Sequence, residues 1–307
     1  MIKNALGQSK TETNSTCPLN SEFGGFKSIA ISPDGESLTA IFSTDTGRRI
    51  RHWSLSTGEE IAFPFMIAPE ISESPNSFPQ YFFLEKTTFT SDSSTLIGVY
   101  YDIVYSEAVV KLWDSTTGEE IQKSYVDFDP NDEAIGTVEI SINPDSSILT
   151  WIGRNTDTDI VSITLWDIQT GKTTHAYSLN SLSRDIAVAS ISSSNSSLII
   201  AKFDGTVDLL DLTTGRTIQS STIGYVLEVV ALHSDGKTLF GVDHNNDTIG
   251  IWDTITAELI GVLEGHVSPI DFLAFHLNSA ILLSGSRDGM IKLWEPPGRE
   301  IRTICAI

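Results

Sequence analysis

Cysteine is scarce in this sequence, and its scarcity excludes two kinds of site. The 307 residues include two cysteines, Cys17 and Cys305, which lie near opposite ends of the chain. Two thiols cannot build the network of disulfides that holds small secreted domains together. They also fall short of the four ligands that a structural zinc ion requires. The alternative that remains is a single bridge between the two ends.

Long apolar segments are also missing. The first residues, MIKNALGQSKTETNST, contain no apolar core of the kind that a secretory signal needs. The sequence has no run of about 18 apolar residues, so we expect no membrane-spanning helix. A cytoplasmic protein without a membrane partner is therefore the expected case.

Basic residues are few compared with acidic ones. The chain has 40 Asp and Glu but 19 Lys and Arg, which gives a net charge of −21. Such a charge repels phosphate backbones and anionic membranes, so we expect no nucleic-acid partner. A basic protein surface would suit it better. The alternative interpretation is that the acidity only keeps the protein soluble.

The sequence does contain a repeated motif, in which a Trp or Leu is followed by an acidic or polar residue and then by a turn. The copies are HWSLSTGEE at Trp53, LWDSTTGEE at Trp113, LWDIQTGKT at Trp166, LLDLTTGRT at Leu210, IWDTITAEL at Trp252 and LWEPPGREI at Trp294. The last three copies are 42 residues apart, the interval before them is 44, and the first two intervals are 60 and 53. An interval near 42 residues accommodates four short strands with turns, so the longer intervals must contain insertions.

A second motif precedes each copy of the first. Apolar and polar residues alternate up to a turn, as in SIAISPDGESLTAIF and VVALHSDGKTLFGVD. The alternation predicts a half-buried strand, and the Pro-Asp-Gly and Ser-Asp-Gly centres are typical of turns between antiparallel strands. Each unit therefore contains four strands. One such sheet cannot bury both faces alone, whereas a ring of sheets can, so the sequence predicts an all-β propeller.

This pattern also predicts the domain organisation. We expect a polar N-terminal extension over residues 1–25 and a propeller over residues 26–307. Its four-stranded blades are expected at about 26–65, 81–126, 136–180, 186–222, 226–263 and 268–307. Residues 64–80, PFMIAPEISESPNSFPQ, are rich in Pro and Ser and are predicted to form a long loop. That loop is either a passive insertion or a binding loop.

These repeats resemble those of the WD-repeat family, over roughly residues 26 to 307. The best match is the final repeat, GHVSPIDFLAFHLNSAILLSGSRDGMIKLWE. In the family, a His, a Ser or Thr, an Asp and a Trp form a buried hydrogen-bonded set within one blade. The resemblance assigns these roles to His266, Ser284, Asp288 and Trp294. The set is physically reasonable, because the Asp can orient the imidazole and the hydroxyl can link it to the indole N–H.

The other repeats depart from the family pattern. Only the last repeat has the Gly-His pair, and Leu210 replaces the Trp although Asp204 keeps the turn Asp. These departures predict weaker internal hydrogen bonding in most blades. They also leave the number of blades open. Six repeats are recognisable, seven blades are common in the family, and the chain could also be part of a larger propeller.

Motifs that carry catalysis or bind metals are missing from the sequence. It contains neither a Gly-x-Ser-x-Gly elbow nor a Gly-rich phosphate loop, and no two of its six histidines have metal-ligand spacing on one strand. The acidic segment 127–133, DFDPNDE, lacks the Gly and the Glu that a calcium loop needs at its sixth and twelfth positions. We therefore expect no catalytic residue, no cofactor and no metal.

Together these observations favour a non-catalytic scaffold or adaptor that holds protein partners on its loops. The alternative is a propeller enzyme, or a regulatory or sensor domain, with a metal or ligand site at the axial channel. The fold alone does not decide between them, because propellers also carry enzymes.

Overall fold

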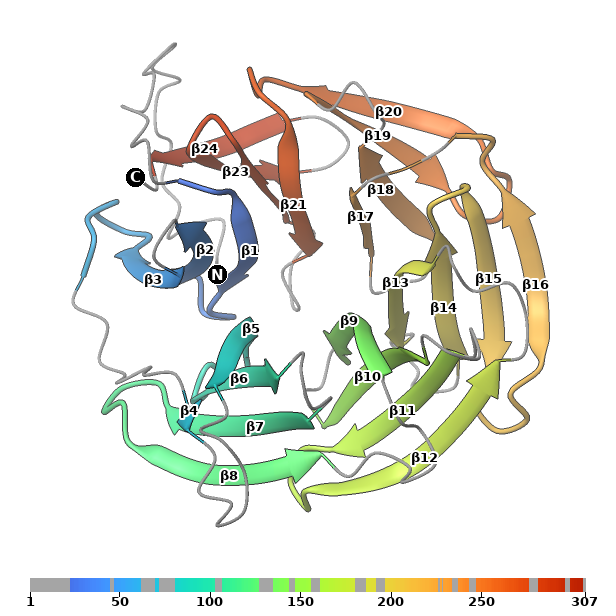
Figure 1. Ribbon diagram of the computed structural model, residues 1–307. Helices are drawn as coiled ribbons and strands as arrows, with labels where there is room; N and C mark the ends of the chain where they lie inside the picture. The colour runs from blue at the N-terminus through green and yellow to red at the C-terminus, as the bar shows by residue number, and fades with distance from the viewer. Residues whose placement is uncertain are drawn as a thin grey trace.

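The computed structural model describes most of the chain. The described residues are 23–44, 47–61, 70–71, 81–102, 107–126, 135–143, 147–155, 161–179, 186–191, 197–225, 227, 229–233, 237–242, 247–275, 281–295 and 299–305. They contain 24 strands, β1 to β24, and no helix. The strands form six antiparallel sheets that follow one another along the chain around a common axis (Figure 1).

Each sheet is a simple meander of consecutive strands. The first contains β1 (Phe26–Ile31), β2 (Ser37–Thr44) and β3 (Gly47–Ser54). The second contains β4 (Glu70–Ile71), β5 (Tyr81–Phe89), β6 (Thr95–Asp102), β7 (Glu107–Asp114) and β8 (Glu120–Val126), and the third β9 (Ile135–Ile142), β10 (Ile148–Asn155), β11 (Val161–Asp167) and β12 (Lys172–Leu179). The fourth contains β13 (Ile186–Ile191), β14 (Ser197–Lys202), β15 (Thr206–Asp211) and β16 (Thr217–Thr222). The fifth contains β17 (Val229–Leu232), β18 (Thr238–Val242), β19 (Thr248–Asp253) and β20 (Leu259–Glu264), and the sixth β21 (Ile270–Phe275), β22 (Leu282–Ser286), β23 (Met290–Glu295) and β24 (Arg299–Cys305).

Two details differ from the sequence-based expectation. The first sheet has three strands among the described residues; where a fourth was expected to begin, Trp53 and Glu60 form an isolated bridge. In the segment 64–80, which was predicted to be a loop, Glu70 and Ile71 pair with Phe82 and Tyr81. The loop prediction is wrong for these two residues, because the edge of β5 offers them backbone hydrogen-bond partners.

The core lies between the sheets. Among the described residues, six clusters of buried apolar side chains are found, and each draws its members from two neighbouring sheets. One of them joins the first sheet to the sixth, with Leu38 and Trp53 packed in the same cluster as Leu283 and Leu293. The described sheets therefore close into a ring of six blades, and each face that one sheet could not bury alone is buried by the next.

The repeated Trp explains part of this packing. It lies on β3, β7, β11, β19 and β23, and it belongs to the cluster shared with the preceding sheet, as Trp166, Trp252 and Trp294 show. A large side chain at this position fills the wedge between two blades. Leu210 takes the same place between the third and fourth sheets.

The outer wall of the ring also connects the first and sixth sheets. The Arg302 guanidinium on β24 donates a hydrogen bond to the carbonyl oxygen of Leu55, which follows β3. Cys305, at the end of β24, is disulfide-bonded. The other cysteine of the chain, Cys17, lies outside the described residues.

Candidate interaction surface

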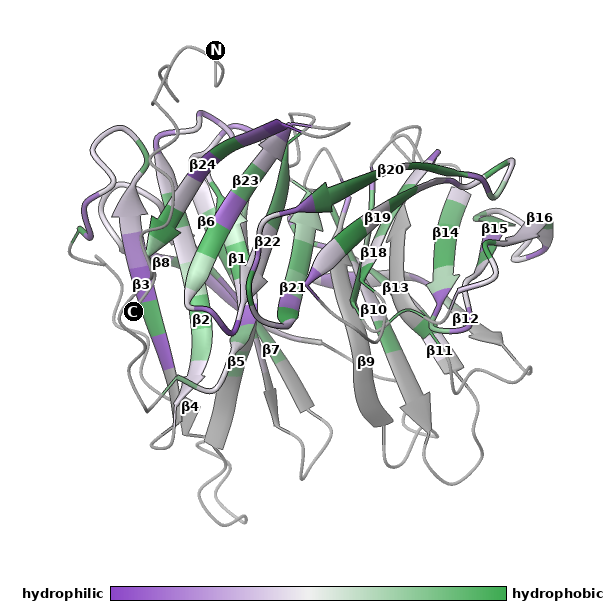
Figure 2. Cartoon of the chain, turned by 90° about the horizontal axis from the view of Figure 1, so that it is seen from above, coloured by the Kyte–Doolittle hydropathy of each residue, from purple (hydrophilic) through white to green (hydrophobic). Residues whose placement is uncertain are grey.

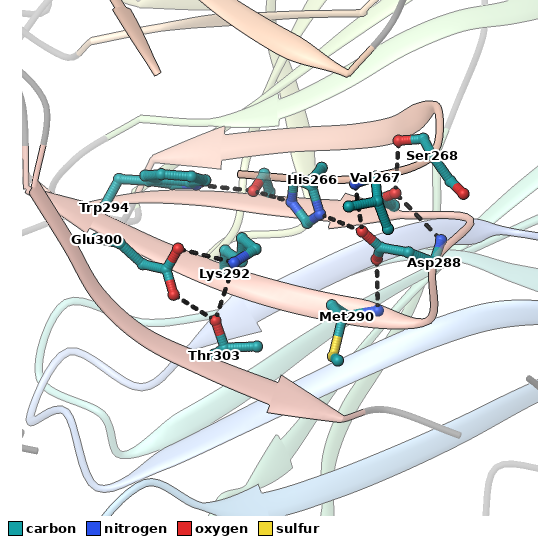
Figure 3. A network of polar contacts seen from close by, with 11 residues as sticks. His266, Val267, Ser268, Asp288, Met290, Lys292, Trp294, Glu300 and Thr303 are labelled. Carbon is teal, nitrogen blue, oxygen red and sulfur yellow. Dashed lines mark hydrogen bonds and ion pairs between the residues drawn. The ribbon is translucent and has the colours of Figure 1, made fainter. Parts of the chain in front are cut away.

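The sixth sheet brings the four residues of the expected polar set together (Figure 3). His266 Nδ1 lies 2.8 Å from Asp288 Oδ2, and His266 Nε2 lies 2.7 Å from Ser284 Oγ. The indole N–H of Trp294 donates to the same Ser284 oxygen at 2.8 Å. Because a carboxylate only accepts, His266 Nδ1 is the donor to Asp288, and the Ser284 hydroxyl can then donate to Nε2. Every polar atom of the set has a partner.

This set has the Ser–His–Asp order of a hydrolase triad, but it cannot act as one. Ser284 has no exposed surface, and its oxygen already accepts the indole N–H. A nucleophilic serine must reach a substrate carbonyl beside an oxyanion site. The buried set therefore stabilises the blade and does not perform acyl transfer.

Local backbone geometry places His266 and Asp288 opposite each other. Gly265 has a φ of +144°, which L side chains rarely adopt, and it precedes His266 in the connection from β20 to β21. Asp288 also accepts the N–H of Met290 at 2.9 Å and that of Val267 at 3.2 Å. Burial is the largest single influence on Asp288 and raises its pKa. The hydrogen bonds from His266 and from these N–H groups outweigh burial, so the pKa of Asp288 lies below its ordinary value.

A second polar network stands next to the first, toward the outer strand. Lys292 Nζ donates to Glu300 Oε2 at 2.7 Å and to Thr303 Oγ1 at 3.2 Å, and it lies 5.8 Å from the centre of the Trp294 ring (Figure 3). It joins β23 to β24 on the half-buried outer part of the sheet. The network therefore fixes the last strand of the ring.

The other sheets lack this set for a simple reason. Ser284 stands two residues after Leu282, which pairs with Trp294. The same register position is occupied in the other sheets by residues without a hydroxyl: Ala40, Gly98, Trp151, Ile200 and Gly241. In the fifth sheet the indole nitrogen of Trp252 is accordingly buried without a hydrogen-bond partner.

The aspartates that follow the repeated Trp or Leu accept hydrogen bonds within turns. Asp114, Asp167, Asp211 and Asp253 each accept the backbone N–H three residues further on, at distances of 2.6 to 2.8 Å. That hydrogen bond is the largest cause that lowers the pKa of each carboxyl. These exposed carboxylates therefore serve as hydrogen-bond acceptors in the turns that follow the strands. Their lowered pKa makes them poor general acids. Asp204 serves a similar turn by accepting the N–H of Thr206.

Within the described residues, no group of three or more His, Cys, Asp or Glu side chains is arranged to hold a metal ion. The same residues include no helix that is both long and apolar enough to cross a membrane. The acidic segment 127–133, for which a calcium loop was considered, lies outside the described residues.

Three exposed apolar side chains lie on one face of the ring. In each meander, the turn from the second to the third strand and the connection to the next sheet lie on the same face, which we call the connection face. Phe203, Tyr225 and Val267 lie in such segments and are 36%, 50% and 80% exposed. Large exposed apolar groups on rigid loops are typical anchors for protein partners.

The core holds these three side chains in place. The carbonyl oxygen of Phe203 accepts the N–H of Leu227 at 2.7 Å, and the Tyr225 ring lies 5.8 Å from the ring of Trp252. Val267 is held through its N–H on Asp288. The buried polar set therefore fixes an exposed residue next to it.

The sequence-based reasoning missed a second exposed apolar region. Leu259, Ile260 and Val262 of β20 are 49%, 55% and 46% exposed on the outer wall of the fifth sheet. The sequence did contain a signal for it, the run LIGVL at residues 259–263, which has no polar residue. The corresponding strands of other repeats contain polar residues such as Gln122, Gln219 or Arg302.

The comparisons with known proteins agree with this geometry. The model of the family "WD domain, G-beta repeat" matches residues 257–295, which include the whole polar set. The last repeat of this β-propeller is a WD repeat. The repeat match covers β20 to β23, and the remaining sheets repeat the same meander with fewer of the family's polar residues.

Several curated proteins are similar to this propeller over part of its length. Autophagy-related protein 16 of Arabidopsis thaliana is 22% identical over 198 residues, which is 64% of this chain and 36% of that protein. Pre-mRNA-processing factor 19 homolog 2 of the same organism is 26% identical over 39% of this chain and 23% of its own length. Nuclear distribution protein nudF of Emericella nidulans is 30% identical over 38% of this chain and 32% of its own length. The propeller thus spans about a third or less of these relatives.

Proposed function

We propose that this β-propeller is a non-catalytic scaffold that holds protein partners on its connection face. The observation that carries the proposal is the exposure of Phe203, Tyr225 and Val267 on loops that are bonded to the core. The side chains of His266, Ser284 and Asp288 are hydrogen-bonded inside the blade, and Asp211 is hydrogen-bonded in a turn. The match of the last repeat to the WD-repeat family supports a binding role, and so does the similarity to proteins whose names refer to autophagy, pre-mRNA processing and nuclear distribution.

The proposed partners are proteins with a basic surface. The net charge of −21 would attract such a surface at long range and repel nucleic acid and anionic membranes. Because exposed charges are screened by salt, retention of a basic partner should weaken as the salt concentration rises from low to physiological values.

The test is capture from a cell extract on the immobilised chain, followed by mass spectrometry. We compare the native chain with Tyr225→Ala and Val267→Asp, and with Ile121→Asp on the outer strand β8 as a control of similar exposure. Proteins retained by the native and control chains should be lost on the two connection-face variants. Retention of the same set of proteins by all four chains would exclude the connection face as the binding surface.

A cytoplasmic location remains a prediction. The disulfide at Cys305 bears on it, because disulfides persist in oxidising compartments and are rare in the cytosol. Trapping of free thiols in intact cells, followed by a mobility shift, measures whether the bridge exists there. A fully reduced chain agrees with the cytoplasm, and a fully oxidised chain contradicts it.

A further inference from the structure

The outermost strand of the fifth sheet presents a free edge. β20 ends the strand order β17-β18-β19-β20 and pairs with β19 alone among the described residues. Figure 1 places it on the periphery of the ring. Backbone N–H and C=O groups on such an edge can accept another strand, so folded proteins usually protect edges with charged residues, proline or a covering segment.

The middle of β20 has neither charged residues nor proline. Its first five residues, Leu259 to Leu263, are apolar, and Figure 2 shows most of the strand as hydrophobic. The other outer strands differ. Lys123 lies on β8, His175 on β12 and Arg302 on β24, while β16 has the polar run Gln219 to Thr222. Among these outer strands, the apolar edge of β20 would give an additional strand the most favourable contacts, because its residues have a high strand propensity.

β20 contains a β-bulge near its start. Ile260 is the extra residue of a β-bulge between Leu259 and Gly261, and pairing with β19 is regular from Gly261 to Glu264. The bulged isoleucine of β8, Ile121, occupies the same repeat position and is equally exposed, at 58% against 55% for Ile260. Ile121 is followed by Gln122 and Lys123, whereas Ile260 is followed by Gly261 and Val262. The two strands are therefore a matched pair that differs in the residues after the bulge.

The ends of β20 are acidic. Glu258 precedes the strand and Glu264 ends it, and both are exposed. The whole chain, including these residues, has a net charge of −21. A second copy of this chain would bring the same acidic ends and the same net charge, which opposes self-pairing. A segment with basic residues at both ends would instead place them beside Glu258 and Glu264.

We infer that β20 is an acceptor edge for an extended apolar protein segment with Lys or Arg at both ends, which joins the fifth sheet as an additional strand. Backbone hydrogen bonds along the edge supply the affinity, Leu259, Ile260 and Val262 supply apolar contacts, and the two glutamates select the basic ends. This site lies on the outer wall and is separate from the connection face of the proposed function.

The probe is a fluorescent synthetic peptide, KTVIVTK, titrated with the native chain and followed by anisotropy. We expect saturable binding. The peptide KTVPVTK, in which proline removes a backbone donor, and ETVIVTE, with acidic ends, should each bind at least about tenfold more weakly. Absence of saturable binding by KTVIVTK, or equal binding of all three peptides, would overturn the inference. These comparisons require no change to the protein.

Protein variants then locate the site. Ile260→Lys and Val262→Lys should each weaken binding of KTVIVTK at least about tenfold, because an edge lysine opposes strand addition and repels the basic peptide. Ile121→Lys, the matched change on β8, should leave binding unchanged. Thermal melts of the variants report folding. Hydrogen exchange of the β20 amides should slow when the peptide binds, and slowing on another outer strand alone would contradict the assignment.

A second copy of the chain is the competing occupant. Sedimentation velocity of the native chain should show a monomer at all concentrations used for the titration. A dimer that Ile260→Lys abolishes would overturn the inference in favour of self-pairing. Val267→Asp changes the connection face and not β20. This variant should lose the captured proteins but should bind the peptide as the native chain does, and that result separates the two surfaces.

Discussion

The fifth and sixth sheets share one architecture and differ in how their buried polar atoms are satisfied. Trp252 pairs in register with Leu239, and Trp294 pairs with Leu282. Each indole packs against the preceding sheet. Trp294 also donates to Ser284, whereas in the fifth sheet Gly241 occupies the position equivalent to Ser284 and the indole N–H of Trp252 has no partner.

This difference separates two roles of the repeated Trp. Packing between blades requires only a large apolar side chain, which explains why Leu210 can replace the Trp in the fourth sheet. The hydrogen bonds to Ser284, His266 and Asp288 form an additional layer of stability that only the sixth sheet has among the described residues. We therefore expect the sixth sheet to depend on its polar residues and the fifth to depend mainly on packing.

The largest expected effect comes from Asp288→Ala. The change leaves His266 and the N–H groups of Val267 and Met290 without an acceptor inside the blade, so the free energy of unfolding should fall by about 3 kcal/mol. Urea denaturation measures it. Asp253→Ala in the fifth sheet removes an exposed turn acid and should cost much less. Equal losses at the two positions would remove the distinction between the sheets.

A matched pair of Trp substitutions sharpens the comparison. Trp294→Phe and Trp252→Phe lose similar ring volume, but only the first also loses a hydrogen bond. Trp294→Phe should therefore be more destabilising by about 1 kcal/mol. If denaturation curves show the two variants to be equally stable, the bond to Ser284 contributes nothing to folding.

The fifth sheet has a second weakness in its last turn. Ala257 has a φ of +61°, whereas the corresponding residue in the preceding sheet, Gly215, has a φ of +65°. A left-handed conformation is strained for alanine and free of strain for glycine. Ala257→Gly should therefore raise the free energy of unfolding by about 0.5 kcal/mol. This figure is the strain that the change relieves minus the entropy that glycine loses on folding. A decrease of that size would show that the turn relaxes in solution.

The smallest expected effect is a pH dependence confined to the sixth sheet. The folded-state pKa of Asp288 lies below its usual value of 3.8, so its carboxylate contributes stability above the unfolded-state pKa. That contribution is lost as the pH falls through the folded-state pKa. The stability difference between the native chain and Asp288→Asn should therefore be constant from about pH 7 to pH 5 and should narrow below about pH 4. A difference that stays the same down to pH 3 would contradict this assignment.

Much of the fold could be predicted from the sequence because its signals are local and repeated. Alternating strands and turn residues indicated six antiparallel sheets, and the resemblance of the last repeat indicated four residues that meet in the structure. The packing of each Trp against the preceding sheet could not be derived, because it depends on contacts between blades. The pairing of Glu70 and Ile71 with β5 was missed because the Pro and Ser around them indicated a loop.

The candidate surfaces were less accessible to sequence reasoning. Phe203, Tyr225 and Val267 are 22 to 64 residues apart and share a face only because the meander brings their loops to one end. The exposure of Leu259, Ile260 and Val262 was hidden by a different ambiguity. An apolar run such as LIGVL is typical of a buried strand, and only its position at the edge of the sheet makes it exposed.

The central claim is that the Ser–His–Asp arrangement of the last blade holds the fold together and does no chemistry. A double-mutant cycle with His266→Ala, Asp288→Ala and the double variant, measured by urea denaturation, tests it most directly. If the two side chains stabilise the blade through their 2.8 Å contact, the combined loss should be smaller than the sum of the single losses by about 1 to 3 kcal/mol. Strictly additive losses would contradict the claim.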